Sequence, residues 1–231
     1  MAQSLIFNNL GFERDERYIF RHLAFQANAG DLVQVVGPNG SGKTSLLRVV
    51  VGLLRAEEGT IEWGEKDTDS SSLAHSLLYL GHETGVNYAL TALENLRWYF
   101  GLNGSKAHSL SEAEEPEMTD EVLVHALNAV GLLGYSDVIC HEMSAGQRRR
   151  VALARLFVSA APIWILDEPF TAIDIAGVAR LEQQLQAHCS RGGIVLFTTH
   201  QTSSLQNIRS LDLADFKPTE SSLYGGELDD A

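Results

Sequence analysis

A glycine-rich stretch of eight residues carries the clearest chemistry in this sequence. It reads G-x-x-x-x-G-K-T from Gly37 to Thr44, the pattern of a phosphate-binding loop. Glycines let the backbone fold closely around phosphate oxygens and turn its N–H groups toward them. Lys43 is then placed on the β- and γ-phosphates, and the Thr44 hydroxyl on Mg²⁺. The expected nucleotide-binding residues are Gly37, Pro38, Asn39, Gly40, Ser41, Gly42, Lys43, Thr44 and Ser45.

The flanking segments are those that this loop requires. An apolar run at 31–36 suits a buried strand, and residues 45–51 can continue as a helix whose N-terminus favours anions. The alternative, a glycine-rich turn before a helix with no nucleotide, is disfavoured by this context. The loop therefore predicts a nucleoside triphosphate, without saying what its energy is used for.

A second polar group follows another apolar run, Pro162 to Leu166. Mg²⁺ prefers hard oxygen ligands and keeps several waters, so Asp167 is a candidate Mg²⁺ ligand. Glu168 turns to another side and is a candidate for orienting or deprotonating an attacking water. His200 also ends a predicted strand and can reach the γ-phosphate region. The alternative, a pair of acids that merely face solvent, is the weaker interpretation downstream of a phosphate loop.

Two further features have competing interpretations. Phe12 could stack on an adenine ring, or it could be a hydrophobic plug at a strand end. The basic run from Arg148 to Arg150 is expected to be a solvated or salt-bridged helix face. The net charge is -13, which argues against a general electrostatic grip on nucleic acid or anionic lipid.

The sequence lacks the patterns of membrane-spanning, secreted and disulfide-rich proteins. No apolar run approaches the ~18 residues of a membrane helix, and residues 1–10 show no secretory signal pattern. Cys140 and Cys189 are too few for a disulfide framework and are expected to be reduced structural thiols.

The order of predicted elements indicates an α/β fold with an N-terminal antiparallel β part. Strands are expected at 4–10 and 18–25, joined by a polar connection, and later at 59–63, 76–80, 162–166 and 193–197. Helices are expected at 90–100, 121–130 with Thr119 as its cap, 145–159 and 174–189. We therefore predict a core of 1–82 and 142–206 and an inserted helical subdomain at 83–141, with a surface loop over 101–120. An acidic, poorly ordered tail is predicted at 207–231.

Several motifs together resemble the nucleotide-binding domain of ATP-binding-cassette (ABC) transporters over nearly the whole chain. Met143-Ser-Ala-Gly-Gln147 is similar to the family signature L-S-G-G-Q, and Ser144 lies 24 residues before Glu168. The segment 169–174 resembles the loop that joins two protomers, with Asp174 at its end. His200 matches the switch histidine. The resemblance implies a P-loop NTPase core of the RecA-like type that binds ATP and Mg²⁺.

The motifs resemble one branch of this family in particular. They include Arg14-Asp-Glu-Arg17, Leu78-Tyr-Leu-Gly-His82, Leu90-Thr-Ala-Leu-Glu-Asn-Leu96 and Trp164-Ile-Leu-Asp-Glu-Pro-Phe-Thr-Ala-Ile-Asp174. That branch contains the ATP-binding subunits of the bacterial and mitochondrial cytochrome c maturation system. The resemblance implies an ATPase coupled to haem delivery, or to release of a haem-loaded chaperone. It places the chain at the cytoplasmic face of the inner membrane, or at the matrix face in an organelle.

The same resemblance implies a head-to-tail homodimer around two ATP molecules, docked on integral-membrane subunits. Signature residues of one copy would act on the ATP of the other: Ser144, Ala145, Gly146 and Gln147. A helix N-terminus is an anion site, which supports this role. No nucleic-acid partner is expected.

This sequence departs from the family pattern at two positions. Glu83 stands where the family usually has a Gln that contacts Mg²⁺ and water. A carboxylate can still bind Mg²⁺, so Glu83 is a candidate metal ligand with Thr44 and Asp167, but it adds negative charge near a triphosphate. Altered Mg²⁺ dependence or slower hydrolysis is therefore expected, without loss of ATP binding. Ala145 replaces the first signature glycine, as it does elsewhere in the branch. Three alternatives remain: a transport ATPase for another substrate, a soluble ABC ATPase for DNA repair or translation, and a non-hydrolysing module. The soluble ATPase is disfavoured because the sequence shows a single cassette without a coiled-coil insertion. The non-hydrolysing module is disfavoured because Glu168 and His200 are intact.

Overall fold

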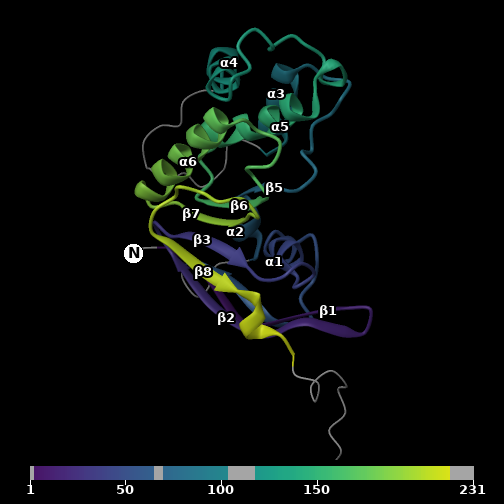
Figure 1. The fold of residues 1–231 in the computed structure, drawn as a ribbon, viewed down its shortest axis with the longest axis vertical. Coiled ribbons are helices and arrows are strands. Elements are labelled where there is room, and N and C mark those ends of the chain that lie inside the picture. Colours follow the sequence, from purple (N-terminus) through teal and green to yellow (C-terminus); the bar gives the residue numbers. More distant parts are fainter. Residues whose placement is uncertain (1–2, 65–69, 104–117, 219–231) are drawn as a thin grey trace, which may run out of the picture.

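A parallel sheet and an antiparallel sheet form the framework of this protein (Figure 1). The computed structural model describes residues 3–64, 70–103 and 118–218. The parallel sheet has the strand order β5-β6-β7-β3-β8. Its strands are β3 (Leu32–Val36), β5 (Leu77–Leu80), β6 (Ile163–Asp167), β7 (Ile194–Thr198) and β8 (Ile208–Asp212).

The antiparallel sheet confirms the predicted N-terminal β part. Its order is β2-β1-β4, with β1 at Ser4–Arg14, β2 at Arg17–Asn28 and β4 at Glu58–Trp63. The hairpin is longer than predicted, because β1 continues to Arg14 and only two residues turn the chain. Those residues, Asp15 and Glu16, have φ values of 54° and 59°, as a tight two-residue hairpin turn requires. The polar segment 11–17 is therefore mostly strand.

Helices cover the parallel sheet and form one end of the molecule (Figure 1). The α-helices are α1 (Lys43–Val50), α2 (Ser70–His75), α3 (Ala92–Asn103), α4 (Asp120–Ala129), α5 (Ala145–Ala154) and α6 (Ile175–Ser190). The described residues also form the 3₁₀ turns η1 (Cys140–Glu142), η2 (Arg155–Phe157) and η3 (Leu213–Phe216). The Val122 N–H donates to Thr119 Oγ1 at 3.4 Å, so Thr119 caps α4 as predicted. None of the described helices has the length and apolar character to cross a membrane.

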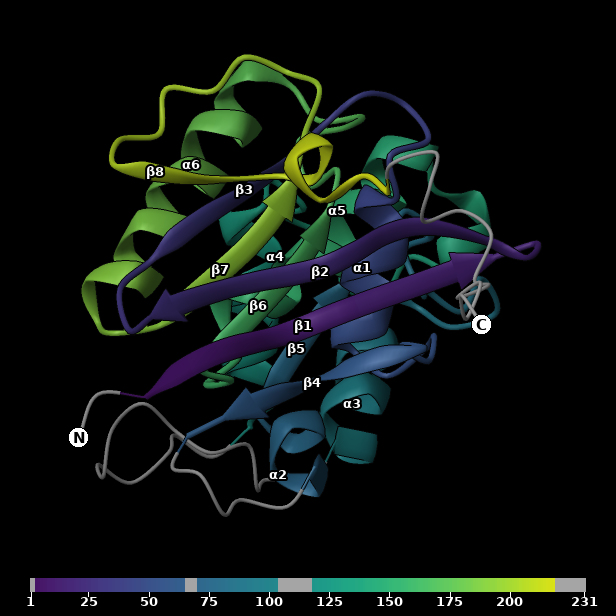
Figure 2. The ribbon, with the colours of Figure 1, turned by 90° about the horizontal axis from the view of Figure 1, so that it is seen from below.

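The middle strands of the parallel sheet are buried on both faces. In β6, Ile163 and Ile165 join the apolar cluster that contains α1 and the antiparallel sheet. Trp164 and Leu166 join the cluster formed with α3, α4, α5 and α6. Burial on both faces explains why this strand reads as a continuous apolar run. Figure 2 shows β1 and β2 crossing over the parallel strands on the α1 side.

The structure of the C-terminal part corrects the prediction of a poorly ordered tail from residue 207 onward. Residues from 207 onward were expected to form a poorly ordered tail, yet β8 pairs in parallel with β3, from Leu32↔Ile208 to Val36↔Asp212. Leu211 and Leu213 are buried. The strand was missed because β8 is an edge strand whose outward residues are polar. Residues 219–231 lie outside the described part of the chain, as does most of the predicted loop 101–120.

Candidate nucleotide-binding site

The phosphate loop lies between β3 and α1, as the motif predicts. Gly37 has φ 141°, and Gly42, which precedes α1, has φ 96°. A Cβ on Gly42 would lie 2.5 Å from Ile19 Cγ2, so glycine lets the hairpin approach the loop. Lys43 Nζ donates to the carbonyl oxygens of Gly37 at 2.8 Å and Pro38 at 3.1 Å. The loop and its lysine therefore form one compact unit.

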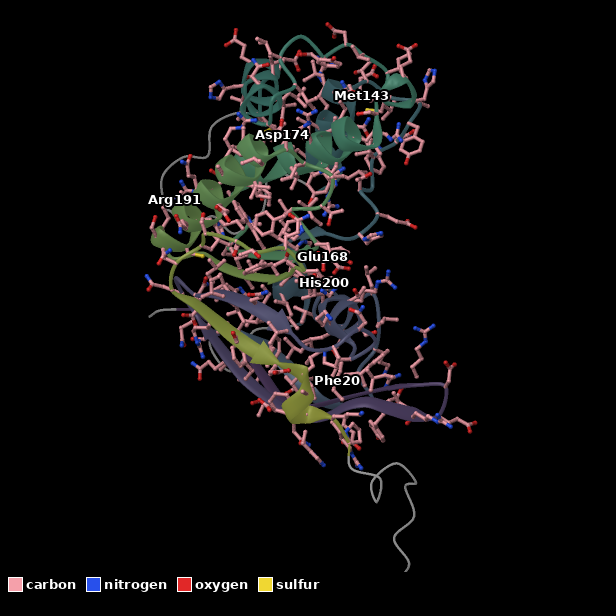
Figure 3. All side chains as sticks on the ribbon, viewed as in Figure 1. Phe20, Met143, Glu168, Asp174, Arg191 and His200 are labelled. Carbon is pink, nitrogen blue, oxygen red and sulfur yellow. The ribbon has the colours of Figure 1, made fainter. Side chains whose placement is uncertain are left out.

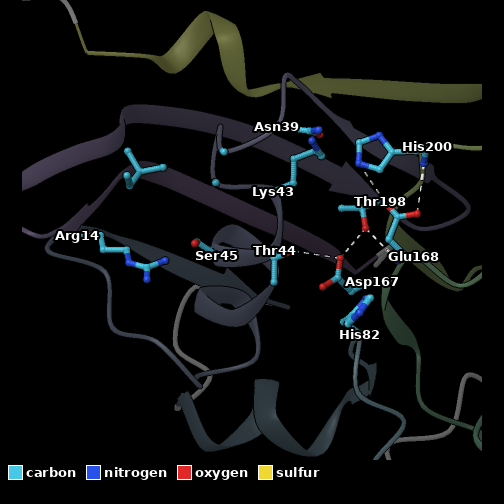
Figure 4. A pocket seen from close by; sticks show the side chains of 13 residues that line it. Arg14, Asn39, Lys43, Thr44, Ser45, His82, Asp167, Glu168, Thr198 and His200 are labelled. Carbon is cyan, nitrogen blue, oxygen red and sulfur yellow. Dashed lines mark hydrogen bonds and ion pairs between the residues drawn. The ribbon is translucent and has the colours of Figure 1, made fainter. Parts of the chain in front are cut away.

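A pocket of about 470 Å³ opens above this loop (Figure 4). Three parts of the chain line it: the hairpin, the phosphate loop, and the carboxyl-terminal ends of parallel strands. The hairpin contributes Arg14 and Ile19, and the loop contributes Asn39, Gly40, Gly42, Lys43, Thr44 and Ser45. The strand ends contribute His82, Asp167, Glu168, Thr198 and His200. The edge where β5, β6 and β7 end thus faces the loop.

Asp167 lies at the bottom of this pocket and is almost fully buried. Its Oδ1 accepts hydrogen bonds from Thr44 Oγ1 at 3.3 Å and from Thr198 Oγ1 at 2.7 Å (Figure 4). Its Oδ2 is buried and finds no hydrogen-bond partner among the described residues. A buried carboxylate oxygen without a donor fits a cation that prefers oxygen ligands. The structure therefore brings Thr44 and Asp167 together in an arrangement that suits Mg²⁺.

Glu168 directly follows β6, and His200 lies two residues after the end of β7. Their side chains are neighbours in the pocket. The Glu168 N–H donates to Thr198 Oγ1 at 3.0 Å, and Glu168 Oε2 accepts from the His200 N–H at 3.3 Å. His200 Nε2 lies 3.6 Å from Glu168 Oε1. The side chain of Glu168 is 18% exposed and that of His200 is 61% exposed. The two predicted catalytic side chains thus meet at the open side of the pocket.

Arg149 corrects the prediction for the basic run. It was expected on a solvated or salt-bridged face, but it is 5% exposed. Its Nη1 donates to the Gly81 carbonyl at 2.8 Å, and its Nη2 donates to the carbonyls of Asp167 at 3.0 Å and Glu168 at 2.8 Å. Burial lowers the pKa of this guanidinium, while the charges of Asp167 and Glu168 oppose that shift. Backbone carbonyls replace water around this charge.

The signature residues lie at the start of α5. Gln147 N–H donates to Ser144 Oγ at 3.2 Å, and Ser144 N–H donates to Gln147 Oε1 at 2.8 Å, which forms a capping box. A Cβ on Gly146 would lie 2.8 Å from the Ala172 carbonyl oxygen, so the signature contacts the loop before α6. Asp174 caps α6 by accepting from the Gly177 N–H at 2.8 Å.

These signature-side residues are separate from the pocket of their own chain. Met143, directly before Ser144, and Asp174 lie toward the helical end, away from Glu168 and His200 (Figure 3). Ser144 and Ala145 are exposed. The described residues that line the pocket do not include them.

Phe12 and Glu83, which were predicted to contact adenine and Mg²⁺, lie outside the pocket lining in the described part of the chain. Phe12 is 6% exposed, and its ring stacks on Phe20 with centroids 5.8 Å apart. The prediction that it stacks on adenine is therefore wrong, and the hydrophobic-plug interpretation holds. Arg14 and Ile19 of the same hairpin line the pocket instead. Glu83 is exposed and is outside the lining in the described part of the chain, where its neighbour His82 takes part.

Comparison with known proteins agrees with this site. The family model described as "ABC transporter" matches residues 20–171, a range that includes the phosphate loop, the signature and Glu168. The chain belongs to the ABC transporter family and is an ATP-binding ATPase of that family.

Within this family, the chain is similar to ATP-binding export proteins of cytochrome c biogenesis. The cytochrome c biogenesis ATP-binding export protein CcmA of Saccharophagus degradans is 52% identical over 210 residues, which cover 91% of this chain and 93% of that protein. The CcmA of Vibrio cholerae is 46% identical over 213 residues, 90% of this chain and 98% of that protein.

Solved structures show the same fold. An ATP-binding cassette in a dimeric post-hydrolysis state with ADP and Pi has a TM-score of 0.69 at 23% identity, and the match covers 85% of this chain and 88% of that chain. A bacterial Atm1-family ABC exporter with ATP bound has a TM-score of 0.73 at 22% identity, and the match covers 92% of this chain and 37% of that chain.

Proposed function

We propose that this chain is the ATP-hydrolysing subunit of a membrane complex in cytochrome c biogenesis. In this role it couples ATP hydrolysis to haem delivery, or to release of a haem-loaded chaperone. The observation that carries the proposal is the identity of 46–52% to cytochrome c biogenesis ATP-binding export proteins, over about nine tenths of both lengths. The intact pocket, with Lys43, Asp167, Glu168 and His200, agrees with it.

The geometry supports a specific division of work in the pocket. The loop N–H groups and Lys43 hold the β- and γ-phosphates of ATP. Thr44 Oγ1 and the free Oδ2 of Asp167 would hold Mg²⁺, which would offset charge on the phosphate oxygens. Glu168, at the open side, accepts a proton from the water that attacks the γ-phosphate. His200, next to Glu168, stabilises the charge that develops on the transferred group.

We also propose that a second copy of the chain completes each site. The signature presents the N-terminus of α5, an anion-binding element, at a distance from its own pocket. In a head-to-tail homodimer, Ser144 and Gly146 of one copy cap the γ-phosphate held by the other. Asp174, at the start of α6, lies beside this contact.

The complex also requires integral-membrane subunits, which place this chain peripherally at the cytoplasmic face of the inner membrane, or at the matrix face in an organelle. The docking region proposed for them is the segment 83–100. Tyr88 is 53% exposed and Trp98 is 51% exposed there. Exposed aromatic side chains of this kind are enriched at protein interfaces.

The proposal is tested by complementation. In bacteria that lack their own ATP-binding subunit for cytochrome c biogenesis, expression of this chain should restore haem-stained c-type cytochromes. The Lys43→Ala variant, expressed to the same level, should not restore them. A parent chain that is expressed, hydrolyses ATP and is recovered with membrane subunits, but restores no c-type cytochrome, would contradict the haem-related role.

A further inference from the structure

Two buried arginines extend from the signature helix toward the pocket edge. Arg149 lies in α5 and Arg155 lies in η2, which continues α5. Their side chains are within the core, at 5% and 3% exposure. Arg155 donates to the carbonyl oxygens of Thr84 at 3.2 Å and Gly85 at 2.9 Å. Both arginines therefore bind the backbone of the segment that follows β5.

Arg149 also binds the end of β6. One of its nitrogens reaches Gly81 O, and the other reaches both Asp167 O and Glu168 O, at 2.8–3.0 Å. One guanidinium thus joins the segments after two neighbouring strands. A planar fork with several donors can do this, whereas the single ammonium of lysine cannot keep all three contacts in the same geometry.

The backbone of Glu168 needs such support. Its φ is 52°, in the left-handed region that non-glycine residues rarely adopt. Strained residues of this kind persist only where their surroundings over-determine them. Thr198 Oγ1 holds the N–H of Glu168 and Arg149 holds its carbonyl, so both sides of the residue are fixed. The direction of the Glu168 carboxylate depends on these two contacts.

We propose that Arg149 is a positioning residue for ATP hydrolysis. It fixes the backbone of Glu168 and joins it to the signature helix and to Gly81, which directly follows β5. Through this contact, the helix that meets the partner copy's ATP and the carboxylate that acts on the chain's own ATP become parts of one unit. The inference rests on the role proposed for Glu168 and is independent of the cargo of the complex.

The test compares Arg149→Lys and Arg149→Gln in the full chain, purified with its membrane subunits. Both should lower kcat, by roughly 10- to 100-fold, because small displacements of a catalytic group are costly. Lys should be milder than Gln. KM and the separately measured nucleotide Kd should stay within two-fold of the parent values.

The matched control is Arg209→Lys. Arg209 lies on β8 and contacts Asp31 and the Gln26 carbonyl, outside the pocket. This substitution should leave kcat unchanged.

A double-mutant comparison separates positioning from general stability. In a Glu168→Gln background, single-turnover hydrolysis should fall by less than two-fold when Arg149→Lys is added, because the group that Arg149 positions is already lost. A merely structural role predicts a lower Tm with an unchanged kcat per folded molecule, or an equal loss in both backgrounds, and either result would overturn the inference. A Glu168→Gln chain with the parent rate removes the role of Glu168 and this inference together. An inactive Glu168→Gln chain with a fully active Arg149→Lys chain refutes this inference alone.

Discussion

The phosphate end and the hairpin end of the pocket are built in opposite ways. At the phosphate end, Asp167 is 2% exposed, and its contacts with Thr44 and Thr198 tie the loop to two strand ends. At the hairpin end, Arg14 projects from a tight turn with its side chain 72% exposed and makes one long ion pair with Asp15 at 3.6 Å. Interactions in a buried, preorganised site are stronger than those in water. Side chains are therefore held precisely where phosphate chemistry takes place and are exposed at the hairpin end. We propose that the base of ATP lies at the hairpin end, because Arg14 and Ile19 line the pocket there.

This difference predicts that substitutions at the phosphate end change the rate, whereas those at the hairpin end change affinity slightly. Asp167→Asn should have the largest effect. It keeps an acceptor for the two threonines but replaces the free Oδ2 with an amide donor. We expect at least a roughly 100-fold lower rate at any Mg²⁺ concentration, as for other removals of transition-state electrostatics, and near-parent ATP binding in EDTA. An Mg²⁺ titration of hydrolysis checks this, and a parent-like titration would contradict the metal site.

Thr198→Val should have the next largest effect. The hydroxyl accepts from the Glu168 N–H and donates to Asp167 Oδ1, so its loss removes the acceptor of the Glu168 N–H and leaves Asp167 Oδ1 with only the longer contact from Thr44. We expect a loss of about 1–3 kcal/mol in the free energy of unfolding and a lower kcat. Thr198→Ser, which keeps the hydroxyl, is the control and should retain most of both. Urea unfolding and ATPase assays measure the two effects, and equal behaviour of Val and Ser would refute the role of the hydroxyl.

Arg14→Ala should change affinity only modestly. An exposed contact between a guanidinium and a base is worth about 0.5–1 kcal/mol, so KM for ATP should rise about two- to five-fold while kcat stays the same. Phe12→Leu tests whether the buried aromatic residue of the same hairpin contributes to ATP binding. Because Phe12 packs on Phe20 in the core, that substitution should lower stability and leave KM unchanged. A larger KM effect from Phe12→Leu than from Arg14→Ala would restore Phe12 as the base platform.

Glu83→Gln should give the smallest change. Glu83 is exposed and outside the pocket lining among the described residues, so ATP binding should persist. Its neighbour His82 lines the pocket, so removing the negative charge of Glu83 should shift the Mg²⁺ dependence or raise the rate by a few-fold, the size of an exposed electrostatic effect. If both the Mg²⁺ titration and the rate match the parent, Glu83 has no part in the metal site.

The sequence predicts the phosphate end well because its chemistry is local. Lys43 and Thr44 follow a glycine pattern, and Asp167 and Glu168 directly follow an apolar strand. Parallel strands place such residues at one edge of the sheet without further information. The capping of α4 by Thr119 was likewise readable from neighbouring residues.

What the sequence did not predict depends on contacts between distant segments. Phe12 is buried because the strand pairing places it opposite Phe20, a register that residue types alone do not reveal. Arg149 is buried because carbonyls 68, 18 and 19 residues away accept its hydrogen bonds. β8 was missed because an edge strand exposes polar residues on one side. Thr198 belongs to a motif with His200, but its contacts with Asp167 and Glu168 arise from the pairing of β6 with β7 and were not predicted.

Purification of the Glu168→Gln chain from detergent-solubilised membranes in the presence of ATP would show whether this ATPase serves a membrane complex that handles haem. Nucleotide content, co-purifying polypeptides and the haem absorption band are read from the same sample. We expect ATP to be retained without hydrolysis, and the complex to contain two copies of the chain, integral-membrane partners, and haem or a haem chaperone. Membrane partners without any haem component would contradict the proposed cargo. A chain that hydrolyses ATP at the parent rate would contradict the role of Glu168, and a chain recovered without a membrane partner would contradict the proposed membrane complex.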